Sequence, residues 1–347
     1  MNRLYALATV FLLSILYVSC SNENCPARTD HVIGTVCTVN AFEGGSEKLY
    51  DEVFTRLAEI DARFSTTRAD SDISRTNAQA GKQPVSVHDD VFFVVKKAVD
   101  VARESKGVFD PTIGPLVKLW GIQTDAPHVP TEAELAAVLP LVDYTKLTLN
   151  ESDNSLFLET AGMALELGGI AKGFAADEVA RILHKHHVKR AIIDLGGNIV
   201  VYGKKRNAAA WAVGVKNPLL EHERFGTPCL AVKVKGNKNS GVSVVTSGTY
   251  ERYFERDGIR YHHILDITSG APAVRPYSSA TIVSEASSLE ADALSTAAFL
   301  LGPEQFSAAF PEVQAFFIQN DGTLFIRKGL KGSIETIDDY FRKAVFY

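Results

Sequence analysis

The chain has little of what marks the specialised classes of protein. Its 347 residues include four cysteines, none in a CxxC pair or at a His/Cys spacing typical of zinc, so neither a disulfide-built fold nor a zinc site is indicated. Lys and Arg (36) are fewer than Asp and Glu (41) and form no long run, which argues against a nucleic-acid partner. Glycine and proline are ordinary in number and 46% of the residues are hydrophobic, which excludes collagen-like and low-complexity classes and indicates a globular protein.

Long apolar runs are also scarce, and the clearest one lies at the N-terminus. Arg3 precedes residues 4–18, which are almost wholly apolar but fewer than the roughly 20 needed to span a bilayer. Such a segment is typical of a secretory signal. It ends with Ser19 before Cys20, a pattern that resembles a bacterial lipoprotein signal in which Cys20 becomes the lipidated first residue. An uncleaved anchor, or cleavage without lipid, is the alternative.

The remaining chain divides into a short tether and one domain. Residues 1–19 are predicted to be the signal, residues 20–30 a polar tether and residues 31–347 the folded unit. Apolar spacings of three and four predict helices, whereas short alternating runs bounded by turn residues predict strands and hairpins. The helices are expected at 46–64, 91–105, 171–187 and 289–301, the hairpins at 147–158 and 315–326, a buried strand at 191–194 and a loop at 65–84. Because strands and helices do not alternate strictly, the fold class is predicted to be α+β, with mixed or antiparallel sheets and packed helices.

The segment from Leu165 to Asp177 carries the strongest chemical signal. A predicted strand ends at Gly168 and Gly169, and a helix follows with Lys172 in its first turn. Glycines let backbone N–H groups approach an anion, the helix start offers partial positive charge, and lysine adds a full charge. Together these features suit a pyrophosphate. The alternative is a tight turn with a solvated lysine, since neither the Walker A nor the GxGxxG order is present.

A second signal is the pair Asp292 and Thr296 near the start of a predicted helix. A separation of four residues places both on one helix face. Together with a backbone carbonyl, two such oxygen ligands would suit Mg²⁺ better than zinc. The alternative is an acidic helix N-terminus that favours the helix dipole.

Two further segments have weaker signals. Residues 109–121 combine Asp110 with prolines and glycines in a stiff loop that could hold a ring system, although such residues also simply interrupt helices. His263 lies near the end of a predicted strand with Asp266 close by, so it could act as an acid or base or be structural. A serine hydrolase is disfavoured because Ser247 lacks the Gly-x-Ser-x-Gly elbow.

In their shared order these segments resemble the FAD:protein FMN transferases, the ApbE-type lipoproteins. The resemblance runs from about residue 34 to about residue 326, through residues 70–77, 109–121, 167–177, 194–198, 243–248, 263–266 and 290–296. It implies an enzyme that binds FAD with Mg²⁺, transfers the FMN half to a threonine of an acceptor protein and releases AMP. It also implies a bacterial inner-membrane lipoprotein that faces the periplasm.

The resemblance implies a role for individual residues. Lys172 and the glycine turn would meet the pyrophosphate, and His263 would activate the acceptor hydroxyl, with Asp292 sharing that task. The metal would be held by the side chains of Asp292 and Thr296 and by a carbonyl of Gly169 or Ala171. The cofactor-binding set comprises Ile33, Thr67, Asn77, Asp110, Pro111, Thr112, Glu166, Lys172 and Ile264.

Two positions depart from the pattern of the family. Glu166 stands where the family commonly has aspartate, so its contact with the flavin could shift. Thr67 stands where an aromatic residue is often found, and loss of that stacking face would weaken FAD retention and favour hydrolysis. Two alternatives to the transferase remain. Without an acceptor, water could attack instead, which would make the protein an FAD pyrophosphatase that yields FMN and AMP; the other alternative is a flavin-binding lipoprotein without catalysis.

Overall fold

The computed structural model describes residues 25–122, 124–219, 226–236 and 241–347. The predicted signal segment and Cys20 lie outside the described residues, as does the first part of the predicted tether. In the described part of the chain, no helix combines the length and apolarity needed to cross a membrane. No disulfide bond involves Cys25, Cys37 or Cys229 among these residues.

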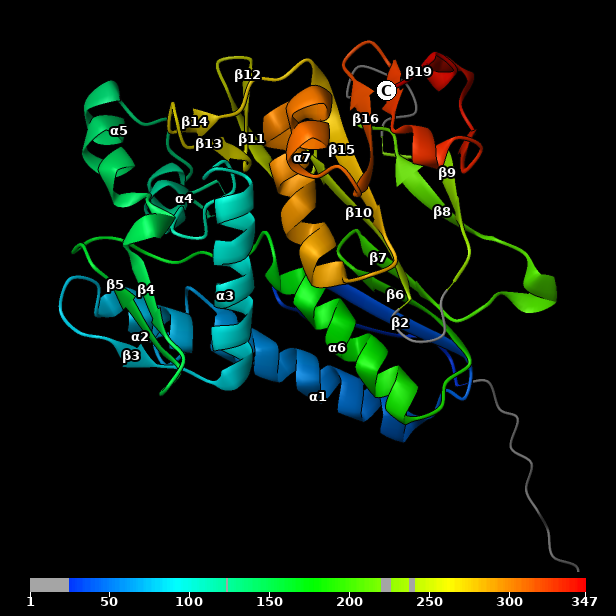
Figure 1. Cartoon of the computed structure of the whole chain (residues 1–347), viewed down its shortest axis with the longest axis horizontal. Helices are drawn as coiled ribbons and strands as arrows, with labels where there is room; N and C mark the ends of the chain where they lie inside the picture. Colours follow the sequence, from blue (N-terminus) through cyan, green and yellow to red (C-terminus); the bar gives the residue numbers. More distant parts are fainter. Residues whose placement is uncertain (1–24, 123, 220–225, 237–240) are drawn as a thin grey trace, which may run out of the picture.

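A nine-stranded sheet forms the centre of the molecule (Figure 1). Neighbouring strands are antiparallel except for β17 and β19, which are parallel. In spatial order the strands are β1 (Arg28–Val32), β2 (Thr35–Glu43), β6 (Arg190–Leu195), β7 (Asn198–Tyr202), β10 (Val242–Gly248), β15 (Tyr277–Ser284), β16 (Gln314–Gln319), β17 (Leu324–Ile326) and β19 (Ala344–Phe346). The predicted α+β class, with mixed or antiparallel sheets, is confirmed.

Helices pack on one face of this sheet, and a smaller sheet covers part of the other. The helices in contact with the central strands are α1 (Glu47–Phe64), α6 (Ala171–Lys185) and α7 (Ser288–Ala309). The described residues also form α2 (Asp72–Ala78), α3 (Asp89–Glu104), α4 (Gly114–Trp120) and α5 (Glu132–Val138). The small sheets are β8 (Trp211–Lys216) with β9 (Pro228–Val234) and β18 (Ile334–Thr336); β3 (Val85–Ser86) with β4 (Leu147–Asn150) and β5 (Ser155–Leu158); β11 (Tyr253–Arg256) with β12 (Ile259–His262); and β13 (Leu265–Asp266) with β14 (Ala271–Pro272).

Alternation along the central strands separates two hydrophobic cores. Val245 and Phe317 join the core under the helices, whereas their neighbours Val244 and Phe316 join the core under the β8–β9–β18 sheet. Successive strand residues point to opposite faces, so these apolar pairs bury both faces of the sheet. The central sheet is thus held as a rigid layer between the two cores.

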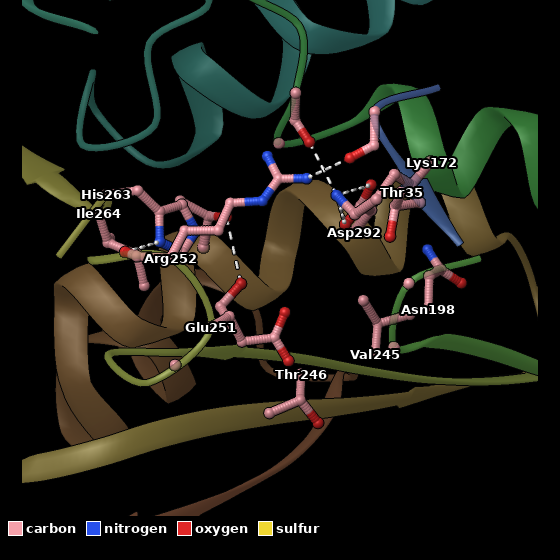
Figure 2. Close-up of a pocket in the computed structure, with 18 of the residues that line it drawn as sticks. Thr35, Lys172, Asn198, Val245, Thr246, Glu251, Arg252, His263, Ile264 and Asp292 are labelled. Carbon is pink, nitrogen blue, oxygen red and sulfur yellow. Dashed lines mark hydrogen bonds and ion pairs between the residues drawn. The ribbon is translucent and has the colours of Figure 1, made fainter. Parts of the chain in front are cut away.

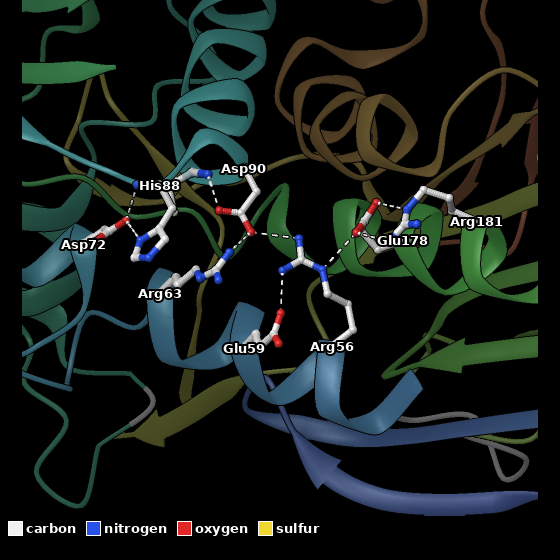
Figure 3. A network of polar contacts seen from close by, with 9 residues as sticks. Arg56, Glu59, Arg63, Asp72, His88, Asp90, Glu178 and Arg181 are labelled. Carbon is white, nitrogen blue, oxygen red and sulfur yellow. Dashed lines mark hydrogen bonds and ion pairs between the residues drawn. The ribbon is translucent and has the colours of Figure 1, made fainter. Parts of the chain in front are cut away.

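A network of ion pairs joins α1, α3 and α6 (Figure 3). Arg56 of α1 contacts Asp90 of α3 at 2.8 Å and Glu178 of α6 at 2.9 Å. Arg63 of α1 also reaches Asp90, at 2.7 Å. One arginine therefore connects three helices that are remote in sequence.

Most predicted elements are present, but the last residues of the predicted tether, 28–30, belong to β1, and two further predictions are wrong. The four expected helices correspond to α1, α3, α6 and α7, the two hairpins to β4–β5 and β16–β17, and the buried strand to β6. The predicted loop at 65–84 contains the seven-residue helix α2, which is too short to show a clear apolar period. The strand expected before Gly168 is an irregular segment with one isolated bridge, from Ala164 to Ile113.

Candidate active site

The described residues enclose a cavity of about 690 Å³ where α6, α7, the end of β10 and several loops meet (Figure 2). Most of the residues with predicted chemistry line it: Asp110, Glu166, Gly169, Lys172, His263, Ile264, Asp292 and Thr296. They come from segments that lie far apart in the chain.

Lys172 and Asp292 form the charged centre of the cavity. Nζ of Lys172 lies 3.3 Å from each carboxylate oxygen of Asp292 and donates to the carbonyl oxygen of Gly168 at 2.8 Å. Oδ2 of Asp292 also accepts from the backbone N–H of Gly173 at 3.0 Å. Asp292 is buried, with 5% of its side chain exposed, and Lys172 is partly buried, with 22% exposed, so solvent screens their charges less than at the surface.

Contacts between α6 and α7 fix this pair. A Cβ at Gly173 would lie 2.2 Å from the carbonyl oxygen of Ser288, so glycine is needed for the two helices to approach. One turn later, Asp177 of α6 accepts from the hydroxyl of Ser287 and from the N–H groups of Ser288 and Leu289, at 2.9 to 3.0 Å. A carboxylate of one helix thereby caps the N-terminus of the other.

An oxygen-rich group lies beside this pair. Thr296 is one turn after Asp292 on α7, and its hydroxyl lies 3.3 Å from that of Ser247. A Cβ at Gly169 would lie 3.6 Å from Oγ1 of Thr296 and 3.3 Å from the ring of Phe109, so a side chain there would fill the space next to the hydroxyl. Glycine therefore keeps this space open.

These donors fit a hard cation that is completed by a substrate. No cluster of three or more His, Cys, Asp or Glu side chains suited to a metal occurs in the described part of the chain. One carboxylate, one hydroxyl and backbone carbonyls form an oxygen-only set, which suits Mg²⁺ with phosphate oxygens as its remaining ligands. Asp292 and Thr296 would hold it, with Gly169 adjacent.

His263 follows β12 directly and is held by Arg252. Its backbone N–H donates to the carbonyl oxygen of Arg252, and its Nδ1 lies 3.2 Å from the same oxygen. Since a carbonyl can only accept, Nδ1 carries the proton and Nε2 keeps its lone pair. Burial, with the positive charge of Arg252, lowers the pKa of His263 to about 3. The ring is therefore neutral at physiological pH and available as an acceptor.

Glu166 lies in the irregular segment before Gly168 and lines the cavity. Burial raises its pKa, against the N–H of Gly168 and the charge of Lys172, which favour the ionised form. Its Oε1 accepts from that N–H at 2.9 Å. Glu166 therefore shapes the glycine turn that leads to Lys172.

The other residues predicted to bind the cofactor or the metal have less direct access to the cavity. Asp110 lines the cavity, but its carboxylate accepts from Thr112 and from the N–H of Tyr144, so it orders its own loop. Asn77 uses its amide on both backbone groups of Leu165. Ile33, Thr67, Asn77, Pro111, Thr112 and Ala171 do not line the cavity.

Several lining residues were missed by sequence reasoning. Arg252, Glu251 and Lys216 add charges at the cavity, and burial raises the pKa of Glu251. The amide nitrogen of Asn198 is buried without a hydrogen-bond partner among the described residues, so a substrate acceptor atom would satisfy it. The signal in the sequence was the pair of glycines, Gly196 and Gly197, directly before Asn198. In the structure both have a positive φ and line the cavity.

The chain is similar to known proteins in sequence and in structure. The model of the ApbE family matches residues 33–317. The chain is 38% identical over 335 residues to the FAD:protein FMN transferase of Treponema pallidum (strain Nichols), covering 91% of this chain and 90% of that protein. It is 37% identical to a protein of the same name from Klebsiella pneumoniae (strain 342), covering 81% and 85%. The crystal structure of the ApbE protein from Thermotoga maritima superposes with a TM-score of 0.78 at 28% identity, covering 88% and 98%.

Proposed function

The chain belongs to the ApbE family, and from this premise we propose that it transfers FMN from FAD to a threonine of an acceptor protein, with Mg²⁺ and with release of AMP. The observation that carries the proposal is the Lys172–Asp292 pair beside Thr296 in one cavity. This arrangement combines a cation and oxygen ligands for a pyrophosphate with a neutral histidine for a hydroxyl.

The reaction requires attack of a hydroxyl oxygen on the phosphorus of the FMN half. A new O–P bond forms, the P–O bond to AMP breaks, and the hydroxyl loses its proton. When bound, Mg²⁺ would neutralise charge on nonbridging phosphate oxygens. Lys172 does the same from the protein side. Bound phosphate groups carry negative charge, which raises the low pKa of His263, and its Nε2 then accepts the departing proton.

The decisive experiment incubates the chain from Ser21 with FAD and Mg²⁺, with and without candidate acceptor domains. We expect the acceptor to gain the mass of one FMN, AMP to appear, and EDTA to abolish both. The matched variant Asp292→Asn should lose turnover. FAD that is bound but never cleaved would leave only the flavin-binding lipoprotein.

Hydrolysis of FAD to FMN and AMP is the second candidate, and the lack of an aromatic side chain at position 67 supports it. Thr67 is exposed and does not line the cavity, so it gives a ring held there no stacking face. Thr67→Tyr should then tighten FAD binding and slow release of FMN without acceptor. Unchanged affinity and unchanged hydrolysis would refute this account of Thr67.

We further propose that Cys20 anchors the protein to the inner membrane, with the domain in the periplasm. The apolar segment before Ser19 and Cys20 supports this, because such a segment is typical of a secretory signal. Labelling of cells with a palmitate analogue should mark the wild-type chain but not Cys20→Ser. Equal labelling of both would contradict the proposal.

A further inference from the structure

Three hydroxyl groups form a chain between the cavity and the backbone of α7. Oγ of Ser247, at the end of β10, lies 3.3 Å from Oγ1 of Thr296 and 2.7 Å from Oγ of Ser295. Ser295 in turn donates to the carbonyl oxygen of Asp292 at 2.8 Å. This hydroxyl chain thus begins at one proposed metal ligand, Thr296, and ends at the backbone of the other, Asp292.

The carbonyl at one end fixes the direction of the whole chain. A carbonyl oxygen can only accept, so the single proton of Ser295 is used on Asp292. Ser295 must then accept the proton of Ser247. Ser247, having used its proton, can offer Thr296 only a lone pair. Thr296 consequently donates its proton to Ser247.

This direction matters because a hydroxyl binds a metal ion through a lone pair. A proton of Thr296 that points to Ser247 leaves the lone pairs of Oγ1 free on its other side, where Gly169 leaves space. The reverse orientation would place a lone pair toward Ser247 and the proton toward the cation. Outer-shell hydrogen bonds commonly orient metal ligands in this way.

We propose that Ser247 is a positioning residue that, through Ser295, holds Thr296 in the orientation that binds Mg²⁺. The inference rests on the proposed function, since it concerns the same metal site. Ser247 acts through Thr296 and does not itself touch the cation.

A hydroxyl contact next to Ser247 provides a matched control. Thr246 and Thr281 face each other on β10 and β15, and their hydroxyl oxygens lie 2.9 Å apart. Thr281 is buried and belongs to no part of the hydroxyl chain. Thr281→Val therefore removes a comparable hydroxyl contact of β10 that is not part of the hydroxyl chain.

The first test measures binding of Mn²⁺ alone by the decrease of its free EPR signal. Ser247→Ala should lower Mn²⁺ affinity about tenfold, while FAD affinity in EDTA stays unchanged. In turnover, the Mg²⁺ concentration for half-maximal rate should rise by the same factor, with the rate at saturating Mg²⁺ largely retained. Thr281→Val should leave both metal readouts unchanged.

The second test examines the direction of the chain. In Ser295→Ala the contact between Ser247 and Thr296 remains, but Ser247 is free to donate to Thr296. Mn²⁺ affinity should therefore also fall about tenfold. Unchanged affinity in Ser247→Ala or in Ser295→Ala would overturn the proposal.

Thr296→Val separates this inference from the proposed function. If this variant lowers Mn²⁺ affinity while Ser247→Ala and Ser295→Ala do not, the metal site stands and the role of Ser247 is refuted. If Thr296→Val also binds Mn²⁺ normally, the proposed metal site itself is wrong. Urea unfolding of each variant shows that the compared proteins are folded.

Discussion

Lys172 and Asp292 are 120 residues apart in the chain, yet the ammonium nitrogen lies 3.3 Å from both carboxylate oxygens. They meet because Gly173 lets α6 and α7 approach and because Asp177 caps α7. The pair provides a positive and a negative group on one side of the cavity, as a pyrophosphate and a cation together require.

Replacement of Lys172 tests its role in catalysis. We expect Lys172→Met to slow FAD cleavage about 100-fold or more, because loss of a positioned charge removes stabilisation of the developing phosphate charge. Product formation at saturating FAD and Mg²⁺ measures this effect.

Lys97→Met is the control for Lys172→Met. Lys97 forms an ion pair with Glu290 at 3.2 Å, and both side chains are substantially exposed, so turnover should not change. A Lys172→Met variant as active as Lys97→Met would contradict the assigned role.

Gly173→Ala tests the close packing of α6 and α7. The added Cβ would meet the carbonyl of Ser288, so the variant should lose about 1–3 kcal/mol in free energy of unfolding and most of its activity. Gly214→Ala on β8 is the control, because its Cβ would be 3.4 Å or more from any neighbour. Urea unfolding and turnover are measured together. Equal stability of the two variants would show that the helices can separate without cost.

His262 should make stability depend on pH. Burial lowers its pKa to about 4, and its ring nitrogens lie 3.0 Å from the carbonyl of Ala273 and 3.3 Å from the N–H of Ile264, so the folded state holds it neutral. The unfolded chain binds its proton near pH 6.5. Stability is therefore complete above that pH and falls as pH decreases toward 4.

The free energy of unfolding measured at pH 7.5 and pH 5.0 checks this dependence. His262→Gln, which keeps a donor and an acceptor, should reduce the loss between these pH values by about 2 kcal/mol. His31→Gln controls for removal of an imidazole from an exposed position on β1. The prediction fails if His262→Gln shows the same pH dependence as the wild type.

The ion-pair network of Figure 3 should contribute to stability but not to chemistry. Asp90→Asn weakens the contacts of this carboxylate with Arg56 and Arg63. Because the side chain of Asp90 is only 11% exposed, the substitution should lower the free energy of unfolding by about 1–3 kcal/mol. Turnover per folded molecule should stay at the wild-type value, because Asp90 does not line the cavity. Asp70→Asn, in an exposed pair with Arg68, should cost under about 0.5 kcal/mol. A cost for Asp90→Asn as small as this would show that the network is no stronger than a surface pair.

Local features of the sequence predicted most elements. The spacing of Leu49, Val53, Leu57 and Ile60 predicted α1, and all four are buried. The helix α2 was missed because its seven residues include few apolar side chains. The segment before Gly168 resembled a strand because Leu165 and Leu167 alternate with Glu166. It is held instead by the side-chain amide of Asn77, which bonds both backbone groups of Leu165, and by the N–H of Glu166, which donates to the carbonyl oxygen of Pro111.

The sequence by itself determined the α+β class, the long helices and the residue types of the centre: a lysine at a helix start, and an aspartate and a threonine four residues apart. Such features depend on neighbours within one or two turns, and local periodicity records them. Only the tertiary structure decided that these segments face one cavity, that Asn198, Arg252 and Glu251 join them, and that Thr67 does not. It also placed the hydroxyl oxygens of Ser247 and Thr296 3.3 Å apart, since β10 and α7 meet only after the sheet and its helices have packed.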